Sequence, residues 1–63
     1  MPIITLTTDL GNKDNYVGAI KGAILSELDS VNIIDISHEV EPFNIQQAAH
    51  IVRNCYKEFP TGT

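Results

Sequence analysis

The fold is decided by one stretch near the start of the chain, Ile3-Ile4-Thr5-Leu6-Thr7-Thr8-Asp9-Leu10-Gly11. The first six residues of this stretch are nearly all β-branched. That composition favours a largely covered strand, so we predict a strand over residues 3–8. Polarity arrives abruptly at Asp9, and Gly11 allows the backbone to turn. The stretch therefore predicts a buried strand that ends in a carboxylate and a glycine turn.

A helix and a second strand follow the glycine turn. Apolar residues recur with a period of 3.6 from Val17 to Leu28, which predicts a helix over residues 14–28. The β-branched run 31–36 has the length of a strand. A strand, a helix and a strand form a βαβ unit, and its right-handed crossover makes the two strands parallel. The predicted fold class is α/β.

A loop and another helix come after the second strand. Pro42 biases the residue before it away from helix, and Asn44 with Gln47 resembles a capping box at the start of a helix. Apolar residues then recur at helical spacing, so we predict a helix over residues 45–58 that Pro60 ends. The chain thus has the βαβα order that begins a Rossmann-like parallel sheet.

Two candidate site residues stand where the predicted strands end. Asp9 follows the first strand and His38 follows the second, so both lie at the sheet edge where open α/β folds bind ligands. A carboxylate there suits two neighbouring hydroxyls, such as those of a ribose, but an Asp after a strand is equally often a turn residue. An imidazole is suited to proton transfer, although a single His at a strand end is more often a hydrogen-bonded turn residue.

Composition narrows the class of protein. Four Lys and Arg against eight Asp and Glu give a formal charge of −4, which argues against nucleic acid or an anionic membrane as the partner. No apolar run approaches the ~20 residues that cross a bilayer, and the first residues lack a signal-peptide pattern, so we expect a cytoplasmic protein. Cys55 is the single cysteine, and no Cys and His spacing suggests zinc, so no metal is expected.

The size and the last residues indicate that the chain is part of something larger. A domain of 63 residues is near the lower limit for folding alone and buries only about 60% of its unfolded surface. The last five residues, 59–63, are turn-like and lead toward a third strand. We expect residues 1–63 to be the N-terminal fragment of a larger α/β domain.

Six short motifs together resemble one known family. In chain order they are Thr7-Thr8-Asp9-Leu10-Gly11, Asp14-Asn15-Tyr16-Val17-Gly18, Lys21-Gly22, Asp35-Ile36-Ser37-His38, Pro42-Phe43 and Phe59-Pro60-Thr61-Gly62-Thr63. Each motif is weak alone. Their order and spacing resemble the N-terminal segment of the S-adenosyl-L-methionine (SAM) hydroxide adenosyltransferases, which are relatives of the fluorinase and chlorinase.

The resemblance implies an enzyme in which water or hydroxide displaces methionine from the 5′ carbon of the ribose of SAM, giving adenosine and methionine. By the same resemblance, Asp9 binds the ribose hydroxyls. Asp14 helps to hold the methionine end, with Tyr16 nearby, and Phe43 lines the substrate site. Halogenating relatives have serine and tryptophan at the positions of Tyr16 and Phe43, which favours hydroxide as the nucleophile here.

The resemblance also implies what the chain lacks. The water-activating residues are expected beyond residue 63, so no catalytic residue is assigned in this chain. SAM is the substrate and no cofactor is expected. The family binds its substrate in clefts shared between subunits, so the resemblance implies a homotrimer.

Two alternatives fit part of the pattern. A calcium-dependent nucleoside hydrolase also pairs a strand with an Asp-rich glycine turn, but its motif needs an acid where Thr7 stands and more carboxylates after Gly11, because Ca²⁺ takes about 6 to 8 oxygen ligands. A non-catalytic nucleotide-binding or subunit-assembly module can use the same βαβ unit, since a fold alone does not imply function. Without the resemblance, Asp14 is read as a helix cap, and Tyr16 and Phe43 as packing residues.

Overall fold

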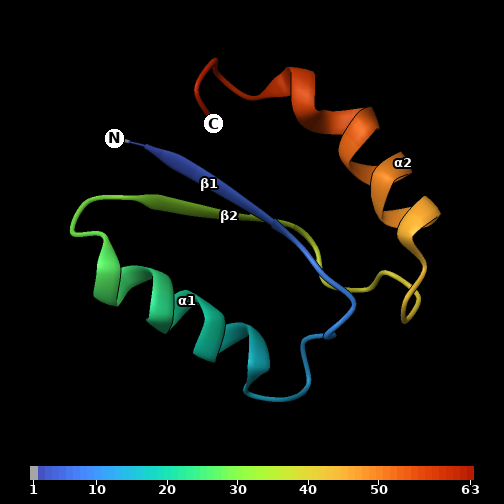
Figure 1. The fold of residues 1–63 in the computed structure, drawn as a ribbon, viewed down its shortest axis with the longest axis horizontal. Helices are drawn as coiled ribbons and strands as arrows, with labels where there is room; N and C mark the ends of the chain where they lie inside the picture. Colours follow the sequence, from blue (N-terminus) through green and yellow to red (C-terminus); the bar gives the residue numbers. More distant parts are fainter. Residues whose placement is uncertain (1) are drawn as a thin grey trace.

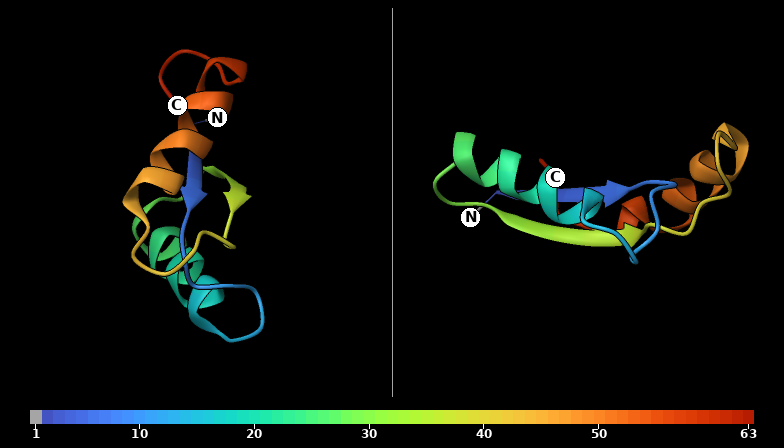
Figure 2. Two further views of the ribbon diagram at one scale, coloured as in Figure 1. Left: turned by 90° about the vertical axis from the view of Figure 1, so that its right-hand side faces the viewer. Right: turned by 90° about the horizontal axis from the view of Figure 1, so that it is seen from below.

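The computed structural model describes residues 2–63. The elements follow the order β1 (Ile3–Thr7), α1 (Tyr16–Glu27), β2 (Asn32–Ser37), α2 (Ile45–Cys55) and a 3₁₀ helix, η1 (Tyr56–Glu58). The predicted α/β class and βαβα order are confirmed. Figure 1 shows α1 beside β2 and α2 beyond β1, and the views in Figure 2 agree that the C-terminus lies close to the start of β1. Within residues 2–63, neither α-helix has the length and apolar character that crossing a bilayer requires.

The sheet consists of β1 and β2, which pair in parallel as the sequence predicts. The register is regular from Ile3 to Leu6 and shifts between Leu6 and Thr7, which leaves Ile36 as an extra residue in β2. A bulge of this kind bends a strand and re-aims the side chains next to it. It lies at the carboxyl end of the sheet, where the sequence places the candidate site.

The two α-helices begin differently. α1 starts at Tyr16 instead of residue 14, and the Asn15 side chain forms no capping hydrogen bond within the described chain. α2 starts at the predicted residue, because Asn44 Oδ1 accepts the Gln47 N–H at 2.9 Å. The other half of the expected capping box is not formed, since Gln47 Oε1 accepts the Glu41 N–H at 2.7 Å instead. That bond attaches the preceding loop to the start of α2.

The last helix is shorter than the predicted 45–58. α2 ends at Cys55, and the next three residues form the tighter η1. Phe59 is extended, with φ −97° and ψ 150°, as expected for a residue that precedes a proline. The α-helix before Pro60 thus ends about one turn earlier than the hydrophobic pattern predicts.

The core is small. In the described chain the buried apolar residues are Val17 of α1, Val31 before β2 and Val40 after it, and no side chain there is completely covered. Large apolar side chains remain exposed, most of all Phe43 at 92% and Ile45 at 81%. Two strands form a sheet too narrow to cover the apolar faces of both helices, so the predicted core faces are only partly buried.

Candidate functional site around Asp9 and Phe43

The loops that follow β1 and β2 meet at the carboxyl end of the sheet (Figure 1). The Thr8 N–H donates to Ser37 O at 2.9 Å, and the Gly11 N–H donates to His38 O at 2.6 Å. Gly11 has a φ of 71°, a left-handed conformation that glycine adopts without steric cost. These bonds fix a tight turn around Asp9, whose side chain is exposed.

The Asp9 carboxylate contacts the loop after β2. Its Oδ2 accepts a hydrogen bond from the Phe43 backbone N–H at 3.0 Å. Two residues that the sequence analysis assigned to one substrate site are therefore in direct contact, although they are 34 positions apart. A carboxylate has two oxygens and about four lone-pair positions, so Asp9 keeps acceptor capacity for a ligand while it holds the loop.

Phe43 combines an unusual backbone with an exposed ring. Its φ of 62° is left-handed, and Phe43 is the non-glycine residue with positive φ in the described chain. For a bulky residue this conformation costs about 1–2 kcal/mol, so surrounding contacts have to hold it. The Asp9 carboxylate supplies one such contact, and the Asn44 N–H bond to Glu41 O at 2.9 Å closes the turn. Strain that presents an exposed aromatic ring is typical of ligand-binding loops.

An open hollow of about 400 Å³ lies between these loops and α2. Its wall is mainly apolar and carries one carboxylate. The lining residues are Thr7, Thr8, Asp9, Leu10, Val40, Phe43, Asn44, Ile45 and Ala48. Small-molecule sites have volumes of about 300–1,000 Å³ and apolar walls with a few polar groups, so this hollow fits the class. A neighbouring hollow of about 240 Å³ shares Asp9 with it and adds His38.

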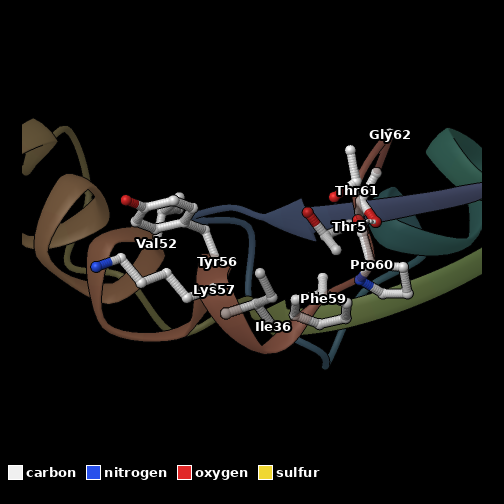
Figure 3. A pocket seen from close by; sticks show the side chains of 10 residues that line it. Thr5, Ile36, Val52, Tyr56, Lys57, Phe59, Pro60, Thr61 and Gly62 are labelled. Carbon is white, nitrogen blue, oxygen red and sulfur yellow. Dashed lines mark hydrogen bonds between the residues drawn. The ribbon is translucent and has the colours of Figure 1, made fainter.

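A larger hollow, of about 510 Å³, lies away from these residues, against η1 and the last residues of the chain (Figure 3). It is lined by Thr5, Ile36, Val52, Tyr56, Lys57 and residues 59–63, and none of these carries a carboxylate side chain. It borders β1, which pairs with β2 on one side and has no strand on its other side within the described chain. An unpaired strand edge of this kind is where a further strand can pair. The hollow around Asp9 is therefore the candidate ligand site, although it is the smaller of the two.

Asp14 and Tyr16 lie apart from that hollow. Asp14 is exposed in the turn before α1, and Tyr16, the first residue of α1, is 56% exposed. Neither residue lines the hollows that contain Asp9. The structure thus joins Asp9 to Phe43 but does not join Asp14 and Tyr16 to them. A role for these two at the methionine end of the substrate stays a prediction.

His38 is the buried polar residue of the described chain, with only 3% of its surface exposed. Its Nδ1 lies 2.7 Å from Thr8 Oγ1. Its Nε2 lies 2.9 Å from Asp35 Oδ1, close enough for an ion pair, yet it forms no well-aligned hydrogen bond in residues 2–63. We therefore treat the contact with Asp35 as electrostatic. Both ring nitrogens face protein groups, so His38 does not present a free nitrogen to a bound water.

Asp35 links His38 to α1. Its Oδ2 accepts a hydrogen bond from Lys21 Nζ at 2.7 Å. The sequence analysis did not identify Thr8, Asp35 or Lys21 as partners of His38. The spacing of Asp35 and His38, three residues apart around the end of β2, was the available signal, but the bulge in β2 that alters their directions has no sequence signature. The Lys21 ammonium, and secondly His38, hold the pKa of the Asp35 carboxyl below its ordinary value of 3.8.

Acid is therefore expected to weaken the fold through Asp35. Because the folded-state pKa lies below the unfolded value, ionised Asp35 adds stability above about pH 4, and this contribution is lost as the pH falls through the folded pKa. In the complete protein, we expect the free energy of unfolding to fall less steeply with acid in Asp35→Asn than in the wild type. Urea titrations between about pH 2.5 and 6 measure this difference, and superimposable acid limbs would contradict the prediction.

Metal ligands are sparse around the Asp9 turn. Across residues 2–63, no group of three or more His, Cys, Asp and Glu side chains is placed to hold a metal ion. The calcium site of a nucleoside hydrolase requires about 6 to 8 oxygen ligands, many of them from clustered carboxylates. The described residues thus give the nucleoside hydrolase alternative no structural support.

Comparison with known families identifies the family of the chain. The profile described as the SAM hydroxide adenosyltransferase N-terminal domain matches residues 4–63. The chain belongs to this family. The resemblance drawn from the six motifs is therefore confirmed, and residues 4–63 of this SAM hydroxide adenosyltransferase chain correspond to the N-terminal domain of the family.

Individual relatives include hydrolases and halogenating enzymes. The chain is 50% identical over 64 aligned positions to the (R)-S-adenosyl-L-methionine hydrolase of Methanocaldococcus jannaschii, covering 95% of this chain and 24% of the relative. It is 36% identical to the fluorinase of Actinopolyspora mzabensis, covering 98% of this chain and 21% of the relative. It is 37% identical to the fluorinase of Nocardia brasiliensis with the same coverage. The chain thus spans less than a quarter of the length of these relatives.

Proposed function

We propose that the complete protein cleaves SAM with water or hydroxide to give adenosine and methionine, and that the present chain supplies part of the substrate site. The observation that carries the proposal is the Asp9 carboxylate, which stands at the carboxyl end of β1, is fixed through Oδ2 to the Phe43 N–H and borders an apolar hollow of about 400 Å³. Family membership and the hydrolase relative at 50% identity support it.

The proposed roles follow from the chemistry of each group. The free acceptor capacity of Asp9 suits the two hydroxyls of a ribose, because both hydroxyls donate. The exposed Phe43 ring suits either the adenine face or the sulfonium cation, which an aromatic face attracts. Asp14 and Tyr16 are proposed for the methionine end, in a closed site that further parts of the protein complete.

In the proposed reaction, the oxygen of water attacks the 5′ carbon of the ribose. The C5′–O bond forms while the C5′–S bond breaks, its electron pair goes to sulfur, and methionine leaves as a neutral thioether. The attacking water loses one proton. Holding water and substrate in line accounts for much of the acceleration in such a displacement. The present chain contributes binding and orientation, and the group that takes the proton is placed outside it.

Hydroxide is proposed over halide as the nucleophile. The relative at 50% identity is a hydrolase and the two fluorinases are 36–37% identical, but the hydrolases of two Salinispora species are 28% identical, so identity alone does not separate the two nucleophiles. Tyr16 and Phe43 depart from the serine and tryptophan that the resemblance associates with halogenation. The hydrolase relative is named for the R form of SAM, and because the L prefix already fixes the amino-acid carbon, R designates the sulfonium sulfur. We propose the same epimer as the substrate here.

Incubation of the complete protein with the separated R and S epimers, followed by chromatography, tests the function. We expect adenosine and methionine from the R epimer, unchanged by a chelator or by added fluoride or chloride. Formation of a 5′-halogenated nucleoside would overturn the choice of hydroxide. Chelator-sensitive release of a free base from nucleosides would favour the nucleoside hydrolase alternative, and binding of adenosine without turnover would favour a non-catalytic module.

A homotrimer in the cytoplasm is part of the proposal. Exposed apolar side chains such as Phe43, Ile45 and Tyr56 favour association with further protein surface, because they are 92%, 81% and 55% exposed. Light scattering on the complete protein, together with fractionation of cells, measures both expectations. A monomer that retains full activity would contradict a site shared between subunits.

A further inference from the structure

Buried histidines need partners, and His38 has an unusual set of them. At 3% exposure it lies between the ends of the two strands, facing Thr8, just after β1, on one side and Asp35 of β2 on the other. Lys21 of α1 reaches the same Asp35. The proposed function gives His38 no task, because neither of its nitrogens is free to meet a substrate or a water.

The groups around His38 indicate which of its two ring nitrogens carries the proton. Thr8 Oγ1 accepts the Leu10 N–H at 3.3 Å, and its own hydrogen can point to His38 Nδ1, which lies 2.7 Å away. With Nδ1 as the acceptor, a neutral ring carries its proton on Nε2, the nitrogen that faces the Asp35 carboxylate. We assign this tautomer because it directs the Nε2 hydrogen toward the Asp35 carboxylate, whereas the other neutral tautomer places the Nε2 lone pair against that anion.

The backbone ties the same two segments together. The Thr8 N–H donates to Ser37 O, and the Val40 N–H donates to Thr8 O at 3.3 Å. The Gly11 N–H donates to His38 O at 2.6 Å. Asp9 therefore sits in a turn whose residues on both sides are bonded to the segment that contains His38. The Asp9 side chain points out of this turn and accepts the hydrogen bond from the Phe43 N–H.

We propose that His38 is a positioning residue: through Thr8 Oγ1 it fixes the turn that presents the Asp9 carboxylate, and Asp35, anchored by Lys21, fixes the His38 ring. The inference rests on the proposed function in one respect, since it takes Asp9 to be a ligand residue. It extends that function by assigning Thr8, His38 and Asp35 a role in substrate affinity although none of them provides the ribose contact itself.

The test uses four variants of the complete protein: His38→Gln, Thr8→Val, Thr8→Ser and the double variant His38→Gln with Thr8→Val. Thr8→Val keeps the branched shape and removes the hydroxyl, whereas Thr8→Ser keeps the hydroxyl. His50→Gln is the matched control, because His50 is exposed and its Nε2 contacts only Asn54 at 3.0 Å among the described residues. Calorimetry gives the Kd for adenosine, thermal melting gives Tm, and hydrogen exchange of a peptide covering residues 8–11 reports on the turn.

His38→Gln and Thr8→Val are each expected to bind adenosine about five- to tenfold more weakly and to exchange faster at residues 8–11, at temperatures well below Tm. The double variant is expected to be no weaker than the single ones, because the pair acts as a unit. Thr8→Ser and His50→Gln are expected to match the wild type. A role in folding alone would lower Tm and leave Kd unchanged.

Unchanged affinity and unchanged exchange in Thr8→Val would overturn the proposal, and so would a Thr8→Ser variant as weak as Thr8→Val. If His38→Gln fails to fold, the two Thr8 variants still decide the matter. If the wild type does not bind adenosine, the proposed function fails. The exchange measurement still tests the positioning role in that case, because it needs no ligand. The proposal then requires residues 8–11 to exchange more slowly in the wild type than in Thr8→Val.

Discussion

Replacement of Asp9 by alanine in the complete protein is expected to weaken adenosine binding by about a hundredfold or more. A hydrogen bond to a charged group contributes about 1.5–3 kcal/mol, and a ribose has two hydroxyls to lose. The same change removes the acceptor of the Phe43 N–H, so the strained loop loses one of the contacts that hold it. Turnover of SAM is expected to fall at least as far, because misplacing a substrate by about 1 Å costs on the order of a hundredfold.

A second variant separates the two tasks of Asp9. Asp9→Asn keeps one side-chain oxygen, which still accepts the Phe43 N–H, but it loses the charge and one acceptor for the ribose. We expect a Tm near that of the wild type together with weak binding. Asp29→Asn is the control, because Asp29 is an exposed acid just after α1. Normal nucleoside binding by a destabilised Asp9→Ala would instead identify Asp9 as a turn residue only.

The strands could be predicted because their residues decide their own conformation. β-Branched side chains favour extended backbone, and the helix between the two runs leaves room only for a parallel crossover. The helix ends were less predictable, since they depend on single contacts. At α2 the Asn44 side chain caps the helix, whereas at α1 the Asn15 side chain does not, and the two residues are chemically identical.

The structure brings together two of the predicted site residues, Asp9 and Phe43, but the sequence does not predict the geometry that joins them. Asp9, two residues after β1, and His38, directly after β2, mark the same edge of the sheet. The bond from Asp9 to Phe43 depends on a backbone N–H, which every residue except proline carries, so no sequence pattern identifies it. The positive φ of Phe43 opposes the preference of a bulky side chain and results from the loop around it. The bulge at Ile36, two residues before the buried His38, also lacks a sequence signature.

The isolated chain of residues 1–63 is expected to have almost no stability of its own and no measurable turnover. Its surface of 4888 Å² exceeds by about 900 Å² the surface of a typical folded monomer of this mass. A surplus of that size is similar to one side of a standard protein interface, about 800 Å². Its Cα radius of gyration, 12.2 Å, is likewise above the value of about 10.6 Å for a compact domain of this length.

The large exposed surface predicts low stability because little apolar area is buried. Fully burying a valine side chain contributes about 1.5–3 kcal/mol, and the described chain buries only three valines and leaves its other apolar side chains half-buried or exposed. Ordering each residue costs about 1–2 kcal/mol of entropy. Urea and thermal unfolding followed by circular dichroism are therefore expected to give a broad transition for the isolated chain. The complete protein is the control and is expected to unfold cooperatively. A steep, concentration-independent transition worth several kcal/mol would contradict the expectation. Turnover by the isolated chain would show that it holds the catalytic group, and His38 and Asp14 would be the first residues to replace.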